Sequence, residues 1–192
     1  MNRMDYLWMK WRAMGLLVLG RHAAAMDVFE AMLKRWPDDT YALASRMHQR
    51  VQSGQTSAAL DDSRHLVVLR ADHAGTWFNH GYVLELAGLW DEALTAFQRA
   101  AELGPELDRA WYGMGLVLIR LGRYDEAVSA LKRNTELQPM SPHGWYQLAR
   151  VHVDRHDPDE AVKIIRHLQK FEPKVAAQLE RETGLLVGKP AT

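Results

Sequence analysis

The chain has 192 residues, 47% of them hydrophobic, which suits one ordinary domain or one continuous repeat array. Lys and Arg number 24, as do Asp and Glu, so the formal net charge is zero and no basic excess favours nucleic-acid binding. Cysteine is absent, which excludes disulfides, cysteine-ligated zinc and a thiol nucleophile.

The first apolar run, Ala13–Gly20, follows Lys10 and Arg12 and therefore has to be compared with a signal peptide. The run is short and Asp5 lies before it, whereas a signal peptide combines a basic start, an apolar run and a small-residue cleavage site. No stretch approaches the ~20 apolar residues of a transmembrane helix. We therefore expect a cytoplasmic protein with no membrane-inserted segment.

Residues recur at a constant spacing through the middle and the end of the chain. Trp77, Trp111 and Trp145 stand 34 residues apart, and the same step links four further sets of positions. Those sets are Gly81, Gly115 and Ala149; Ala93, Ala127 and Ala161; Phe97, Leu131 and Ile165; and Pro105, Pro139 and Pro173. Within one period the apolar spacing predicts two helices separated by a break at Gly122.

This pattern closely resembles the tetratricopeptide repeat, in which Trp-x2-Leu-Gly-x2-Tyr is followed by Ala-x3-Phe and then Pro. The match is specific in 74–141, good in 142–175 and weaker upstream. The resemblance implies an all-α fold, a right-handed α-solenoid of about five helix-turn-helix repeats with a C-terminal capping helix. The expected repeats span about 6–39, 40–73, 74–107, 108–141 and 142–175.

The second repeat departs from the family pattern. Arg46 and Arg50 fall where apolar residues belong, and Ser63 replaces the bulky residue of the second helix. We therefore expect its first helix to be rotated or shifted, with Tyr41 as its large anchor.

The C-terminal end of the array has a predicted cap. After Pro173, an apolar stripe predicts an amphipathic helix over about 174–186, which a stacked array needs at its end. The stripe contains Val175, Ala176, Leu179 and Leu186. We expect one domain, 1–187, followed by a disordered tail at 188–192.

In the tetratricopeptide family, the first helix of each repeat lines the concave side of the array, and ligands commonly lie there. Phe78, Tyr112 and Tyr146 occupy one equivalent position in three consecutive repeats, with arginines nearby. This column suits an extended or helical peptide with apolar anchors and acidic groups. The alternative is that the aromatics pack against the neighbouring helix. The residues expected to contact a partner are Phe78, Tyr82, Arg109, Tyr112, Leu116, Arg120, Tyr146 and Arg150.

The N-terminal end is a second candidate contact. Leu7, Trp8 and Trp11 lack a preceding repeat to cover them, which would suit self-association or the docking of another protein. The alternative is that they fold inward against Phe29 and Met32.

Other residue patterns give no catalytic or metal site. His152 and His156 have the i, i+4 spacing of metal ligands, but two imidazoles without a third ligand predict no metal, and we expect no cofactor. Paired acids such as Asp125-Glu126 recur at helix starts, where they favour the dipole. We therefore expect a non-enzymatic adaptor for a protein or peptide. The alternatives are a self-associating scaffold, which would be a homo-oligomer contacting through the aromatic N-terminal end, and a chaperone of the same repeat type that shields its partner.

Overall fold

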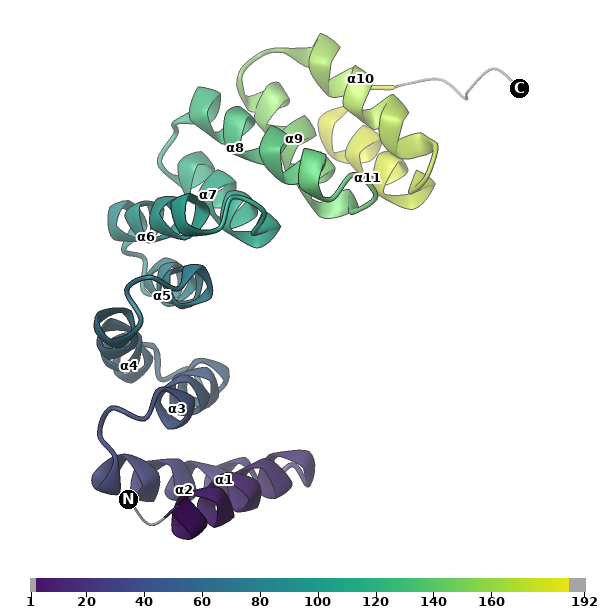
Figure 1. Cartoon of the computed structure of the whole chain (residues 1–192). Coiled ribbons are helices and arrows are strands. Elements are labelled where there is room, and N and C mark those ends of the chain that lie inside the picture. The colour runs from purple at the N-terminus through teal and green to yellow at the C-terminus, as the bar shows by residue number, and fades with distance from the viewer. Residues whose placement is uncertain (1–2, 187–192) are drawn as a thin grey trace. The chain divides into compact units, whose positions relative to one another are not determined.

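The computed structural model describes residues 3–186, and every regular element in that range is an α-helix (Figure 1). The expected tail at 188–192 lies outside the described residues. The chain divides into two compact units, Met1–Gly88 and Leu89–Thr192. The helices are α1 (Arg3–Val18), α2 (His22–Arg35), α3 (Thr40–Gln52), α4 (Thr56–Leu69), α5 (Ala74–Leu86), α6 (Trp90–Leu103), α7 (Asp108–Arg120), α8 (Tyr124–Leu137), α9 (Pro142–Asp154), α10 (Pro158–Gln169) and α11 (Pro173–Thr183).

The helix starts follow the spacing of the sequence. Helices α3, α5, α7 and α9 begin at residues 40, 74, 108 and 142, and α2, α4, α6, α8 and α10 begin at 22, 56, 90, 124 and 158. Each step is 34 residues. The turn before each even-numbered helix from α2 to α10 contains one left-handed residue, at positions 20, 54, 88, 122 and 156. Glycine occupies four of these positions, because it alone adopts this conformation without steric cost.

The first unit stacks its helices in chain order: α1 contacts α2, α2 contacts α3, α3 contacts α4, and α4 contacts α5. Its largest fully buried side chains include Phe29, Met32, Leu43 and Leu84. The second unit follows the same order from α6 to α11 and adds contacts of α9 with α7 and α11. Each helix is therefore covered mainly by its neighbours in the chain.

Large side chains from the helices on both sides of α7 pack against its glycines. A Cβ atom added to Gly113 would lie 2.7 Å from Cζ of Phe97 on α6, and one added to Gly115 would lie 2.6 Å from Cγ of Leu131 on α8. Phe97 and Leu131 are almost completely buried. Gly113 and the recurrent Gly115 therefore allow the close approach of α7 to α6 and to α8.

The recurrent tryptophans are half-buried, and their indole nitrogens bind the loops between helices. Trp77 Nε1 donates to the carbonyl of Ala71 at 2.8 Å, and Trp111 Nε1 donates to that of Pro105 at 2.9 Å. Trp145 Nε1 donates to the carbonyl of Pro139 at 2.8 Å. Each tryptophan thus combines packing with one hydrogen bond to the preceding loop.

The expected shift of the first helix in the second repeat is wrong, because α3 begins in phase with α5, α7 and α9. The two arginines instead reach Asp62 on α4, which is 3% exposed. Arg46 binds this carboxylate through two nitrogens at 2.6 and 3.1 Å, and Arg50 Nη1 donates to it at 2.8 Å. Tyr41 is half-buried with its ring 6.1 Å from that of Phe29. Charge pairing therefore replaces apolar packing in this repeat.

Ser63, where the other repeats have a bulky residue, takes part in a second buried polar contact. Ser63 Oγ lies 2.8 Å from the carbonyl of Leu60 and 2.9 Å from Nδ1 of His80 on α5. Burial of His80, with a smaller contribution from the charge of Arg64, lowers its pKa to about 4. The imidazole is therefore neutral at pH 7.

The capping helix ends earlier than the stripe predicts. Helix α11 stops at Thr183 because Gly184 takes a left-handed conformation (φ 72°), and the exposed Leu186 belongs to no helix. Ala176 and Leu179 are the buried residues of the expected apolar face.

The substitution His156→Gly should stabilise the protein. His156 holds φ at 57° in the position where the other turns have glycine. Removal of the Cβ relieves a strain of about 1–2 kcal/mol, of which the greater freedom of unfolded glycine offsets about half. Urea denaturation should show a gain of about 0.5–1 kcal/mol in the free energy of unfolding. The matched control, Gly122→Ala, should lower it, and a loss in both variants would contradict the strain.

The stability should depend on pH through His80. Since the folded pKa lies below the unfolded value of 6.5, the unfolded chain binds more protons between pH 6.5 and about 4. This part of the stability is complete above pH 6.5 and falls by up to about 1.4 kcal/mol per pH unit down to about pH 4. Urea denaturation at several pH values should show a shallower dependence for His80→Gln than for the unchanged chain. Parallel curves would show that His80 has no such role.

Candidate functional site

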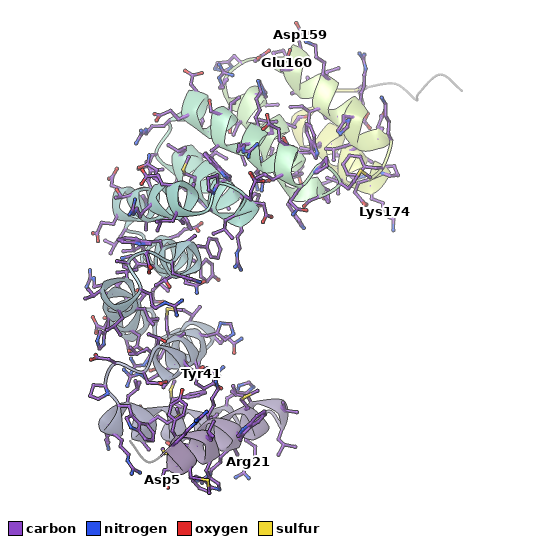
Figure 2. The ribbon with its side chains drawn as sticks, in the orientation of Figure 1. Asp5, Arg21, Tyr41, Asp159, Glu160 and Lys174 are labelled. Atoms are coloured by element: carbon purple, nitrogen blue, oxygen red, sulfur yellow. The ribbon has the colours of Figure 1, made fainter. Side chains whose placement is uncertain are left out.

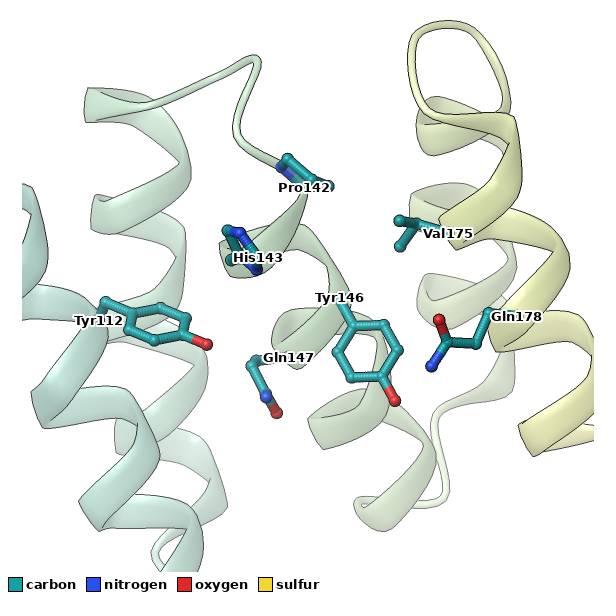
Figure 3. Close-up of a pocket in the computed structure, with 7 residues that line it drawn as sticks. All are labelled: Tyr112, Pro142, His143, Tyr146, Gln147, Val175 and Gln178. Carbon is teal, nitrogen blue, oxygen red and sulfur yellow. The ribbon is translucent and has the colours of Figure 1, made fainter. Parts of the chain in front are cut away.

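One pocket in the second unit combines residues from three helices. It has a volume of about 310 Å³ and lies between α7, α9 and α11 (Figure 3). Its lining is mixed, with two phenols, two carboxamides, one imidazole and two apolar side chains. The lining residues are Tyr112, Pro142, His143, Tyr146, Gln147, Val175 and Gln178.

The two rings and two amides of the pocket come from three helices, and Tyr146 and Gln147 both belong to α9. Figure 3 shows Tyr112 directed from α7 toward α9, and Gln178 directed from α11 toward Tyr146. Gln147, on α9, lies between Tyr112 and Tyr146. A carboxamide offers two donors and an acceptor, so both faces of an extended backbone could be bound here.

A hydrogen-bond network at Tyr146 ties α9 to α11. Tyr146 Oη donates to Glu182 Oε2 at 2.5 Å, Arg150 Nη1 donates to Tyr146 Oη at 3.3 Å, and Arg150 lies 3.8 Å from Glu182. The bond from Tyr146, followed by one from Gln178, lowers the pKa of the Glu182 carboxyl. The Tyr146 bond also raises the pKa of Arg150. The network therefore fixes the Tyr146 ring at the edge of the pocket.

The structure brings only some of the predicted partner-binding residues together. Tyr112 and Tyr146 line the pocket, and Arg150 contacts the Tyr146 hydroxyl. Arg109, Leu116 and Arg120 lie on α7 outside its lining.

The other two predicted residues belong to α5 in the first unit, where Phe78 is half-buried and Tyr82 is exposed. Tyr112 and Tyr146 are half-buried as well. The aromatic positions therefore both pack and present surface, so the two alternatives from the sequence are not exclusive.

Sequence reasoning missed the contribution of α11 to the pocket. It treats this helix only as a cap, yet Val175 and Gln178 form one wall. Helix α11 contacts α9 and α10, and α9 contacts α7 and α8 in the same way. The sequence already indicates this. A capping helix that packs like the first helix of another repeat must also border the surface that the first helices of the repeats form.

The apolar residues of the N-terminal end do not fold inward. Phe29 and Met32 are fully buried, but Trp8 and Trp11 remain 61% and 67% exposed, and Leu7 is exposed too. The inward alternative is therefore wrong for the tryptophans.

The histidines and paired acids have structural roles. His152 is buried, and its Nδ1 lies 3.1 Å from Oδ2 of Asp157, while His156 occupies the left-handed turn. Asp159 and Glu160 lie in the first turn of α10 (Figure 2). Among residues 3–186, no group of three or more His, Asp or Glu residues is placed to hold a metal ion. Within the same range, no helix has the length and apolar character needed to cross a membrane.

The model of the tetratricopeptide repeat matches residues 50–108, 78–139 and 112–176. The chain belongs to the tetratricopeptide repeat family. No match was found among curated proteins. The fold is an all-helical α-solenoid.

Solved structures share this fold at low sequence identity. MamA from Desulfovibrio magneticus RS-1 is 19% identical with a TM-score of 0.78, covering 91% of this chain and 94% of that one. YrrB, described as a TPR protein with an unusual peptide-binding site, is 19% identical with a TM-score of 0.76, covering 88% of each chain. TTC0263 from Thermus thermophilus is 23% identical with a TM-score of 0.66, covering 91% of this chain and 96% of that one. Tetratricopeptide proteins are generally non-catalytic modules that bind protein or peptide partners, which supports a role in protein interaction.

The substitution Tyr146→Phe should raise the pKa of Glu182 toward its ordinary value, because it removes the main hydrogen bond to that carboxylate. The carboxyl resonance of Glu182 can be titrated by NMR. Gln178→Ala should produce a smaller rise, since its bond is the second contribution. Tyr112→Phe serves as the control and should leave this pKa unchanged; an equal rise in all three variants would contradict the network.

Proposed function

We propose that the chain is a non-enzymatic adaptor that holds a peptide or protein segment over α7, α9 and α11. The observation that carries this proposal is the pocket of about 310 Å³ between these three helices. It is open to a segment lying across the helices, and its lining offers both apolar contact and hydrogen bonds.

The size of the pocket favours an anchoring side chain over a cofactor. Ligand pockets range from about 300 to 1,000 Å³, so this one lies at the lower limit. It has room for one large apolar side chain against Tyr112, Val175 and Pro142. The rest of a peptide would then lie along the surface outside the pocket.

The polar lining suits the backbone of such a peptide. Gln147 and Gln178 stand on different helices, and each can donate to a peptide carbonyl and accept from a peptide N–H. Main-chain hydrogen bonds of this kind hold an extended segment without regard to its sequence. The anchor pocket would then provide the selectivity.

Charge near the pocket favours acidic residues beside the anchor. Arg120 and Arg150 are exposed, and Arg109 lies in the first turn of α7. Arg150 also contacts Glu182, so Arg120 is the stronger candidate for an ion pair with a ligand. Since the chain has no net basic excess, these local charges suit an acidic peptide better than a nucleic acid.

Three further predicted residues extend this proposal. Leu116, on α7 one turn after Tyr112, would add apolar contact beside the pocket. On α5 of the first unit, Phe78 and Tyr82 would form a separate apolar patch for the same partner or another one. Tyr82 is the more accessible of these two, with 43% of its surface exposed.

A library of random twelve-residue peptides displayed on phage tests the proposal. Selection on the immobilised chain should enrich peptides with an aromatic or large aliphatic anchor next to acidic residues. Binding of an enriched peptide, measured by fluorescence anisotropy, should weaken at least tenfold in the Tyr112→Ala/Gln147→Ala variant, since about 1.4 kcal/mol corresponds to tenfold.

The control variant is Tyr124→Ala, which removes a half-buried tyrosine of the same unit that does not line the pocket. It should leave the affinity unchanged. Failure to enrich any peptide, or equal affinity in both variants, would reject the pocket as the binding site. Circular dichroism should show the same helical content in all three proteins.

A further inference from the structure

Helix α1 presents an unusually apolar face to solvent. Its opposite face packs in the protein, where Ala13 is completely buried. The exposed apolar side chains follow one another at helical spacing, and within residues 3–186 no element covers them. They are Met4, Leu7, Trp8, Trp11, Met14 and Val18, which we call the α1 stripe.

The α1 stripe is large enough to be an interface. Its side chains are between 38% and 86% exposed, which corresponds to on the order of 700 Å² of apolar surface. The largest patch of a typical monomer measures about 300–600 Å². A stable interface takes about 800 Å² from each partner, so this face alone nearly meets that size.

The order of residues in the α1 stripe is symmetric about Trp11. Trp8 and Met14 stand three residues to either side, Leu7 and Gly15 stand four, and Met4 and Val18 stand seven. Steps of three, four and seven all return to the same face of a helix. A second α1 running in the opposite direction would therefore present a matching face at every level.

We propose that two copies of this chain associate through their α1 helices, packed antiparallel about a two-fold axis at Trp11. A surface that is its own complement is what a two-fold dimer requires, because both copies use the same residues. Trp11 meets Trp11 at the axis, Trp8 of each copy meets Met14 of the other, and Met4 meets Val18. The pairing of Trp8 with Met14 gives a favourable contact between sulfur and ring.

Gly15 provides the space that this packing needs. A Cβ added to Gly15 would have no heavy atom within 4 Å, so the backbone there is open to a neighbour. In the antiparallel pair it lies opposite Leu7 of the second copy. The large side chain of Leu7 thus packs against a glycine, as Phe97 packs against Gly113 inside the second unit.

The charges around the α1 stripe are compatible with this arrangement. Lys10 lies 4.4 Å from the ring centroid of Tyr41, and Arg12 lies 5.2 Å from that of Trp8, so both cations beside Trp11 are held by aromatic rings of their own chain. Arg3 would come beside the last turn of the second α1, which has no basic residue of its own. A cation at that end of a helix is stabilised by the exposed carbonyls.

Sedimentation velocity over a range of concentrations tests the dimer. The full chain should change from 22.0 kDa to twice that mass as its concentration rises. Trp11→Glu and Trp11→Lys should each remain monomeric, because two like charges would meet at the axis. An equimolar mixture of these two variants should restore a one-to-one dimer, which only the contact of position 11 with itself predicts. Val68→Glu, at an exposed position on α4, is the control and should leave the dimer intact.

Disulfide trapping tests the direction of the helices, and the absence of cysteine from the chain makes the result unambiguous. Leu7→Cys mixed with Gly15→Cys should form a crosslinked dimer on oxidation. Neither variant alone should do so, because like positions stand about 12 Å apart along the axis, from eight residues at about 1.5 Å each. A chain that stays monomeric at all concentrations, a dimer that survives Trp11→Glu, or crosslinking of Leu7→Cys alone would overturn the proposal.

Discussion

Mutual burial between neighbouring helices is the constraint on which this structure depends. Two helices alone cannot cover their own apolar faces, so the outer side of each pair has to be buried by the next. The contacts of Phe97 with Gly113 and of Leu131 with Gly115 show how closely successive helices must approach for this to happen. Wherever the succession stops, an apolar face remains. At the C-terminal end α11 covers it, whereas in the part of the chain that the structure describes the outer face of α1 remains in contact with solvent.

The second repeat shows that the same geometry can be reached with different chemistry. Its helices keep the 34-residue step although Arg46 and Arg50 stand at apolar positions. Two arginines around the buried Asp62 leave each charge with a partner, which a buried ionic group requires. The neighbouring Ser63–His80 contact likewise replaces a bulky side chain with a hydrogen bond. The buried His80, whose pKa is lowered, makes the first unit more dependent on pH than an apolar core would be.

The family and the helical fold could be predicted from the sequence because glycine, alanine and tryptophan recur at positions where packing demands their size. The chemistry of the second repeat could not, since the pairing of Arg46 with Asp62 joins residues whose match is visible only once α3 and α4 lie side by side. The apolar spacing continues to Leu186 and therefore does not reveal that Gly184 ends α11. The recurrence of aromatic residues predicts Tyr112 and Tyr146, but Gln147 and Gln178 carry no repeat signature, so nothing in the spacing distinguishes them from other surface amides.

The last helix that the structure describes, α11, forms one wall of the pocket. Terminal helices open more readily than central ones, because fewer neighbours have to be released. When α11 opens, Val175 and Gln178 leave and the pocket loses one wall, so the proposed ligand would find a complete pocket only in molecules in which this helix is closed. Any molecule held there would in turn slow the hydrogen exchange of the α11 amides. The hydrogen bond from Tyr146 to Glu182 joins α9 to α11 and adds to the packing that holds this wall of the pocket in place.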